Sequence, residues 1–409
     1  MSILILLDQC KAIPVKEFMD TLKSGKLGSG CGMWSIYNEI KPSDLYCYLY
    51  AKFGVPNGMQ NLLRNNHSDN LIHWEWAFEH QNGFLIIQGA NMRTEVILRG
   101  DGWKFSECDR QNFIDHVKRD IGNYGKRMSE IRAEILEDWD LVINPYRQLR
   151  ASINELKRQL DALELNINFD KSTPKDIHDL KQQEAEWAIL TRKFNHGIGL
   201  SMAIRTMTPI LAESFVNMLI FILCRPEIKT NKRLYENYVR SNIDVKIQSL
   251  HINCRHFKQA VDWNSEVCGR YNTIVNTRND MLHGNVVPDK LKFSEIFFNG
   301  TVPVFKKYES MWQRGIGTSI DAAGFDKVTP DLKAVDDFIH YVISCLEDKM
   351  QDLVMAMLGR RDIGINKKDK RIGMLLPEHI VDSYSPAFPH EPNNPKPKEP
   401  LVNMSGKPL

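Results

Sequence analysis

Three apolar segments in the first hundred residues, separated by polar and glycine-containing turns, predict a small antiparallel sheet. Residues 71–80, 84–88 and 94–99 are rich in aromatic and β-branched side chains, which are typical of strands. Gln81-Asn82-Gly83 separates the first two segments, and Asn-Gly favours a hairpin turn because both residues accept positive φ angles. A helix over residues 43–53 is predicted to flank these three strands.

After residue 108 the apolar spacing becomes that of helices. Asn144 followed by Pro145 is typical of an N-cap and a first helical position. Apolar residues then recur at alternating steps of three and four, at Tyr146, Leu149, Ile153, Leu156, Leu160 and Leu163. A second helix is predicted to start at Ser172-Thr173-Pro174, to run through Trp187 and Phe194, and to fold back antiparallel onto the first. A dimerising coiled coil is the alternative to this helical hairpin.

From Pro209 onward the pattern predicts a four-helix bundle. The first helix is expected to begin at Pro209, the second to span residues 231–254, and the third residues 257–283. The fourth is expected to run from Thr329 to Gly359. The connection over residues 284–328 is too long for a tight turn, so short strands or a small helix are expected there.

Together these patterns predict a mostly α protein. The expected organisation is an N-terminal α/β module with a small antiparallel sheet over residues 1–107, a helical region with a long hairpin over 108–207, the bundle over 208–360, and a basic, proline-rich tail over 361–409. Proline density from residue 385 onward forbids helices and sheet ladders. The tail is therefore predicted to be largely disordered.

The net charge does not identify a binding partner, whereas the cysteine pattern indicates the cellular compartment. The formal net charge is +2, so an RNA-binding surface would have to be a local patch, of which residues 367–371 are one candidate. The eight cysteines are scattered without a C-x-x-C pair, as in a reduced cytosolic protein. The N-terminus lacks the features of a signal peptide. We expect a cytoplasmic protein with no membrane segment.

The third bundle helix closes with the string Asn-Thr-Arg-Asn-Asp-Met-Leu-His-Gly over residues 276–284. Arg278 and His283 stand in an R-x-x-x-x-H spacing, and Gly284 is a natural residue to end the helix. Metal-free RNA cleavage requires a group that moves protons and a group that stabilises the pentavalent phosphorane. Histidine can serve as base or acid, and arginine grips phosphate oxygens. Such cleavage leaves a 2′,3′-cyclic phosphate and a 5′-hydroxyl.

This string resembles the R-x(4–6)-H signature of the HEPN superfamily, and the segment AESFVNMLIFIL from residue 212 is similar to the first helix of many such domains. The resemblance covers roughly residues 208–359. It implies a cofactor-free, metal-independent endoribonuclease that acts as a homodimer with a composite site across a two-fold axis. It also implies a toxin or antiviral (abortive-infection) effector, with an antitoxin or a phage-derived trigger as a further partner.

The resemblance assigns the catalytic roles to Arg278 and His283. Asn279 matches the polar position beside the arginine, whereas Asp280 and Glu213 are supporting candidates only. Three alternatives stay open. Arg278 and His283 could simply cap the helix, the bundle could be a non-catalytic HEPN-like module that binds protein or RNA, or a metal-dependent nuclease could reside in the N-terminal module.

Two other residue sets have side chains suited to binding zinc or stacking on bases, but their spacing favours other interpretations. His251, Cys254, His256 and Cys268 do not have the spacing of a structural zinc site, so no metal is expected. Trp74 and Trp76 share one face of a strand and could stack on bases, but core packing is the preferred interpretation.

Overall fold

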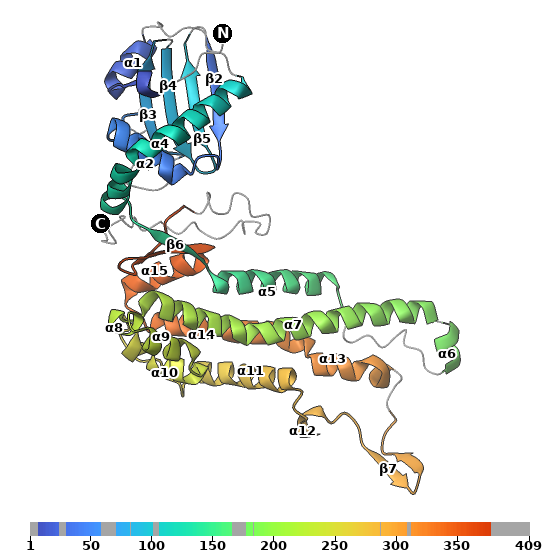
Figure 1. The fold of residues 1–409 in the computed structure, drawn as a ribbon. Helices are drawn as coiled ribbons and strands as arrows, with labels where there is room; N and C mark the ends of the chain where they lie inside the picture. Colours follow the sequence, from blue (N-terminus) through green and yellow to red (C-terminus); the bar gives the residue numbers. More distant parts are fainter. Residues whose placement is uncertain are drawn as a thin grey trace. The chain divides into compact units, whose positions relative to one another are not determined.

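The computed structural model describes residues 7–23, 30–58, 71–81, 83–100, 106–165, 177–182, 184–286, 288–308 and 312–377. The protein is mostly helical, with an N-terminal five-stranded antiparallel sheet (Figure 1). The described chain forms two compact units, residues 7–142 with 362–377, and residues 143–361. The predicted fold class is confirmed.

The first unit is built on a sheet with the strand order β1-β3-β4-β5-β2. Its strands are β1 (Lys11–Ala12), β2 (Cys31–Ile36), β3 (Ile72–His80), β4 (Gly83–Ala90) and β5 (Thr94–Arg99). The three predicted strands are β3, β4 and β5, and the predicted flanking helix is α2 (Pro42–Phe53). The edge strands β1 and β2 were not predicted, because β1 is only two residues long and β2 lacks a clear apolar alternation.

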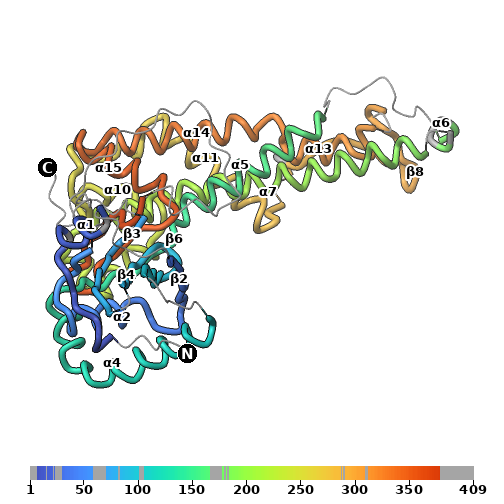
Figure 2. The backbone as a smooth tube through the Cα atoms, turned by 90° about the horizontal axis from the view of Figure 1, so that it is seen from above, coloured from blue at the N-terminus to red at the C-terminus, as the bar shows by residue number. Residues whose placement is uncertain are grey.

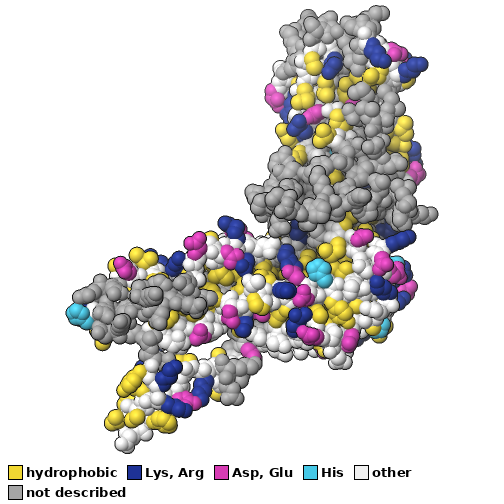
Figure 3. All heavy atoms as spheres, turned by 180° about the vertical axis from the view of Figure 1, so that it is seen from behind, with side chains coloured by type: hydrophobic (Ala, Val, Ile, Leu, Met, Phe, Trp, Pro, Cys, Tyr) yellow, Lys and Arg dark blue, Asp and Glu magenta, His cyan; other side chains and the backbone are white. Residues whose placement is uncertain are grey.

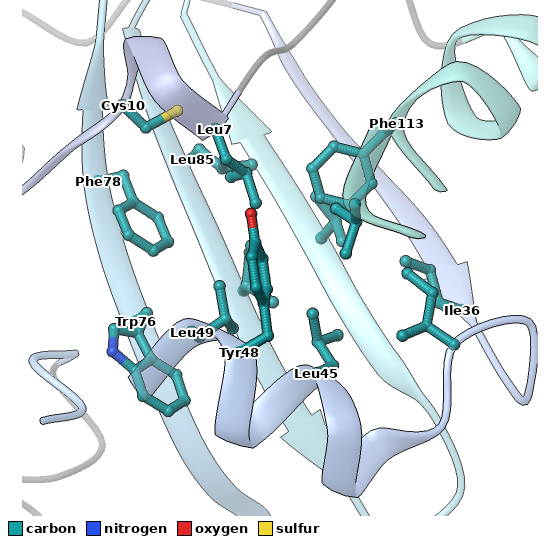
Figure 4. Close-up of a cluster of buried hydrophobic side chains, with 14 of the residues drawn as sticks. Leu7, Cys10, Ile36, Leu45, Tyr48, Leu49, Trp76, Phe78, Leu85 and Phe113 are labelled. Carbon is teal, nitrogen blue, oxygen red and sulfur yellow. The ribbon is translucent and has the colours of Figure 1, made fainter. Parts of the chain in front are cut away.

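Both faces of the sheet are covered, which explains the apolar runs in its strands. One face packs on α2 and α4 (Glu107–Ile135), where Tyr48, Trp76 and Phe113 are fully buried (Figure 4). The short helix α1 (Val15–Lys23) covers part of the other face through Phe18. Trp74 packs against Trp76 with ring centroids 5.7 Å apart, so the tryptophan pair belongs to the core.

A second, three-stranded sheet completes this unit and corrects two expectations. β6 (Trp139–Ile143) interrupts the region predicted to be entirely helical, and it pairs with β9 (Asp362–Asn366), which pairs with β10 (Ile372–Gly373). The start of the predicted disordered tail is therefore ordered. Residues 378–409 lie outside the described residues.

The basic run at residues 367–371 joins β9 to β10. Lys367 pairs with Asp138 and Asp140, at 3.0 and 3.4 Å, and Arg371 pairs with Glu137 at 2.7 Å. These acidic partners neutralise much of the candidate patch, which weakens its interpretation as an RNA-binding surface.

The second unit is organised around the long helix α7 (Glu184–Leu223). α5 (Pro145–Ala162) lies antiparallel along it, and α11 (Glu266–His283) and α14 (Phe325–Ser344) pack on it too (Figures 1 and 2). The predicted hairpin is confirmed by the packing of α5 on α7. The predicted start at residues 172–174 lies outside the described residues, and a short helix, α6 (Ile177–Gln182), precedes α7.

The predicted N-cap at Asn144 is confirmed and has a second role. Its Oδ1 accepts a hydrogen bond from the Arg147 amide at 3.2 Å. Its Nδ2 donates to the carbonyls of Met357, Leu358 and Arg360. One buried side chain therefore both begins α5 and satisfies the end of α15 (Asp348–Gly359).

Pro209 does not begin a helix, because α7 continues through it. The domain boundary expected between residues 207 and 208 thus falls inside one helix. Proline removes one backbone hydrogen bond, but Ile204, Thr208, Leu211 and Phe215 around it are buried, and this packing keeps the helix continuous. By length and composition α7 could cross a membrane, yet 61% of its most apolar window is buried within the unit.

Three other predicted bundle helices have different bounds. Residues 231–254 form α9 (Lys232–Arg240) and α10 (Ile243–Asn253), because the chain breaks at Ser241-Asn242. α11 starts only at Glu266, after Ser265 caps it. The last predicted helix begins at Phe325 and splits into α14 and α15. The split occurs where Leu346 forms a β-bridge with Phe257.

Short elements fill the connections, as expected for residues 284–328. They are α12 (Pro288–Leu291), the hairpin of β7 (Ile296–Asn299) and β8 (Val302–Phe305), a π-helical turn (Gln313–Gly317) and α13 (Thr318–Ala323). α8 (Pro226–Lys229) joins α7 to α9.

Candidate active site

Arg278 lies in the C-terminal part of α11 and points toward α7. Its Nη2 donates to Glu213 Oε1 at 2.7 Å, and its Nη1 donates to Asn279 Oδ1 at 3.1 Å. The side chain is 16% exposed. Its buried Nε has no hydrogen-bond partner among the described residues. The guanidinium is thus held from two sides and keeps an unused donor.

Glu213 comes from α7 and forms an ion pair with Arg278. Its side chain is 31% exposed. Because the Arg278 side chain is mostly shielded from water, its attraction to a nearby carboxylate is screened less than that of an exposed pair. Of the two supporting acidic candidates, Glu213 is therefore the one that orients a predicted catalytic group.

His283 is the last residue of α11 and is exposed to solvent. Gly284 ends the helix as predicted, in the left-handed conformation with φ 60°, and its amide donates to the Asp280 carbonyl. Asp280 also fixes the following turn, because its carboxylate accepts from Asn285 Nδ2 at 3.1 Å. Asp280 thus shapes the chain immediately after the histidine.

The two predicted catalytic side chains leave α11 in different directions. Five residues on a helix correspond to a rotation of about 140° and a rise of about 7.5 Å. Arg278 faces the bundle, where Glu213 holds it, whereas His283 stands at the exposed helix end. Within one chain the two side chains therefore have different surroundings, and their catalytic roles stay predictions.

Two further residues of the bundle belong to the surroundings of Arg278. Tyr271 lies two turns earlier on α11, is fully buried, and stacks on Phe338 with ring centroids 4.4 Å apart. Burial and then the charge of Glu213 raise the pKa of the Tyr271 hydroxyl. That hydroxyl has no hydrogen-bond partner within the described part of the chain.

Lys246 on α10 is the other residue, and it is only 8% exposed. Its Nζ donates to Asn217 Oδ1 at 3.0 Å. Burial lowers the pKa of Lys246, and the negative charge of Glu213 opposes that shift. Sequence reasoning missed Lys246 and Tyr271, because neither carries a motif. The available signal was the spacing of Glu213 and Asn217, which places both on one face of a helix.

No group of three or more His, Cys, Asp or Glu side chains that could hold a metal ion lies together in the described ranges. Among the residues considered for zinc, His256 pairs instead with Glu347, with Nδ1 and Oε2 3.0 Å apart.

In Figure 3 the visible surface of the second unit mixes Lys and Arg with Asp and Glu side chains.

Comparisons with known proteins found no match for this chain. No family model matches the sequence, no curated protein resembles it, and no solved structure matches its fold.

Proposed function

We propose that the protein is a HEPN-type, metal-independent endoribonuclease that works as a homodimer in the cytoplasm. Arg278 binds and stabilises the scissile phosphate, and His283 transfers protons to and from the ribose oxygens. The observation that supports this most is the placement of the R-x-x-x-x-H string. It ends a helix of the bundle, with the arginine pre-oriented by Glu213 and Asn279 and the histidine open to solvent.

The divergence of the two side chains favours a composite site. Because Arg278 and His283 leave α11 about 140° apart, a second motif facing the first across a two-fold axis would supply the missing group. Exposed apolar residues flank the histidine, with Leu282 56% and Val286 80% exposed. Apolar residues gathered in one exposed region are typical of a surface covered by a partner. A toxin or abortive-infection role, with an antitoxin or a phage-derived trigger, belongs to the same proposal.

The test is RNA cleavage by the full-length protein in excess chelator. Arg278→Ala and His283→Ala are each expected to lower kcat at least about 100-fold, the usual loss when a proton-transfer or phosphate-stabilising group is removed. Products should carry 2′,3′-cyclic phosphate and 5′-hydroxyl ends. Loss of wild-type activity on chelation would point instead to a metal-dependent nuclease. Binding without cleavage would point to a non-catalytic module.

The chain offers a matched control for each variant. Arg270 lies on the same helix and pairs with Asp337 at 3.4 Å, so Arg270→Ala removes an arginine ion pair away from the site. His251 is an exposed histidine in the last turn of α10, so His251→Ala removes a similar histidine. Both controls should keep wild-type activity.

Mixing the two inactive variants tests whether the site is composite. If each site takes its arginine and its histidine from different subunits, exchanged mixtures of Arg278→Ala and His283→Ala protein should regain about a quarter of wild-type activity, since half of the dimers carry one intact site of two. A mixture that stays inactive although subunits exchange would reject this arrangement.

A further inference from the structure

Lys246 is a buried cation with few partners, and it lies next to the proposed site. It is 8% exposed, and among the described residues its Nζ makes one hydrogen bond, to Asn217 Oδ1 at 3.0 Å. An ammonium group has three donors. Burying such a charge beside a single neutral amide is costly, so its position calls for an explanation.

Asn217 places Lys246 beside the ion pair of the site. Asn217 follows Glu213 by four residues in α7, so the two side chains are neighbours on one helix face. The charge of Glu213 acts on Lys246, and Glu213 contacts Arg278 at 2.7 Å. One carboxylate from α7 thus pairs with a cation from α11 and acts electrostatically on a cation from α10.

The charge balance of this group differs from that of a simple ion pair. Arg278 and Glu213 alone sum to zero and would offer an RNA phosphate little net attraction. With Lys246 the sum is one positive charge, which matches the single negative charge of a phosphodiester. Tyr271 adds no charge, because burial and then Glu213 raise the pKa of its hydroxyl. The group also holds unused donors on Arg278 Nε and the Tyr271 hydroxyl, within the described residues.

We propose that Lys246 is a positioning residue of the ribonuclease site, which shares Glu213 with Arg278 and keeps the group cationic for an RNA phosphate. When the phosphate arrives, Arg278 exchanges part of its contact with Glu213 for the phosphate, and Lys246 compensates the carboxylate. This inference rests on the proposed function, and it adds a residue that the R-x-x-x-x-H string does not contain.

The test is a charge-swap rescue measured on RNA cleavage by the full-length protein. Lys246→Met removes the charge and should lower kcat about tenfold, the scale of one charge acting over several ångströms at an effective dielectric constant near 20. Adding Glu213→Gln to Lys246→Met restores one net positive charge and keeps an oxygen that can accept from Arg278, so kcat should rise at least about threefold above that of Lys246→Met. Should the double variant be slower than both single variants, Glu213 and Lys246 do not act through charge, and the inference fails.

Lys229→Met is the matched control. Lys229 Nζ also donates a hydrogen bond to a residue of α7, the Phe221 carbonyl at 2.6 Å, but Phe221 lies eight residues after Glu213, near the end of that helix. This variant should cleave RNA like the wild type. If Lys246→Met does not fold, Lys246→Gln keeps a polar group at the position and serves in its place.

A second measurement separates this inference from the proposed function. In thermal unfolding without RNA, the effects of Glu213→Gln and Lys246→Met should be non-additive, because the two charges interact. Additive effects would overturn the inference even if the protein cleaves RNA. Non-additive effects together with a complete lack of RNA cleavage would uphold the charge group and reject the ribonuclease.

Discussion

Two buried lysines, one in each unit of the molecule, have opposite surroundings. Lys52 in α2 has an 8% exposed side chain and contacts Asp8, Asp120 and the Tyr48 hydroxyl, the last two at 2.5 and 3.3 Å. Lys246 in α10 is 8% exposed as a whole residue, and among the described residues its Nζ has one hydrogen-bond partner, the neutral amide of Asn217. The first cation is saturated by protein groups, and the second is not.

The protonation energetics of the two lysines follow from these partners. Burial on its own lowers the pKa of Lys52, but the hydrogen bonds and charges of Asp120 and Asp8 outweigh it and raise the pKa. Burial lowers the pKa of Lys246, and Glu213 offsets this only in part. A saturated cluster stabilises a fold, whereas an incompletely paired charge in a motif-bearing region is a candidate for function.

Stability measurements should separate the two lysines most clearly. Lys52→Met leaves Asp120 without its cation and should lower the free energy of unfolding by about 3 kcal/mol, as expected when one partner of a buried pair is removed. Lys246→Met removes a poorly paired charge and should change it by less than about 1 kcal/mol in either direction. Urea unfolding of both variants checks this. Equal losses would remove the distinction.

Acid should weaken the Lys52 cluster selectively. Burial by itself raises the pKa of Asp120, but hydrogen bonds from Lys52, Tyr48 and Asn123 outweigh it and lower the pKa to about 2. A carboxyl with a depressed pKa contributes stability above its unfolded pKa near 3.9 and loses it as the pH falls toward 2. The stability gap between wild type and Asp120→Asn, up to about 2 kcal/mol, should therefore close between about pH 4 and pH 2. A gap that stays constant over this range would contradict the assignment.

Alkali should act on the lysines with opposite signs. A lysine with a lowered pKa destabilises the fold while it is charged, so the wild type should gain stability relative to Lys246→Met as the pH rises toward the unfolded value near 10.4. Lys52 has a raised pKa, so its contribution is complete below that value and is lost only above it. Unfolding of both variants from pH 8 to 11 measures this, and the stability difference between wild type and variant should change with pH in opposite directions for the two lysines. Parallel slopes would contradict the contrast.

The smallest effect is expected at Arg270, which serves as the surface reference. Its pair with Asp337 spans 3.4 Å, and the two side chains are 47% and 36% exposed. Such exposed pairs contribute about 0.5 kcal/mol, so Arg270→Ala should barely shift the unfolding midpoint. A loss of stability comparable to that of Lys52→Met would show that solvent exposure does not determine how much each of these ion pairs contributes to stability.

Local signals in the sequence predicted the local structure well. Strand β5 was predicted with its observed bounds, and Asn144-Pro145 begins α5 as expected. Gly284 ends α11 in the left-handed conformation that glycine readily adopts. Each of these features is decided within about one helical turn or one strand of sequence, where side-chain shape and hydrogen bonding suffice.

Features that depend on packing were predicted less well. The continuity of α7 through Pro209 is decided by buried neighbours on both sides, against the local preference of proline. Ser241-Asn242 divides one predicted helix, and the bridge between Phe257 and Leu346 accompanies the division of another. In each case the bounds of the helix depend on a contact or a chain break. The spacing of apolar residues along the sequence does not reveal it.

The sequence alone therefore determined which helix end carries Arg278 and His283, because their spacing and the terminal glycine are local properties. Only the tertiary structure decided what surrounds the arginine. Glu213 is 65 residues away from Arg278 in sequence, and Lys246 joins the group through Asn217 on another helix. Such pairs form when helix packing brings distant faces together, since the charges interact over a few ångströms regardless of their separation along the chain.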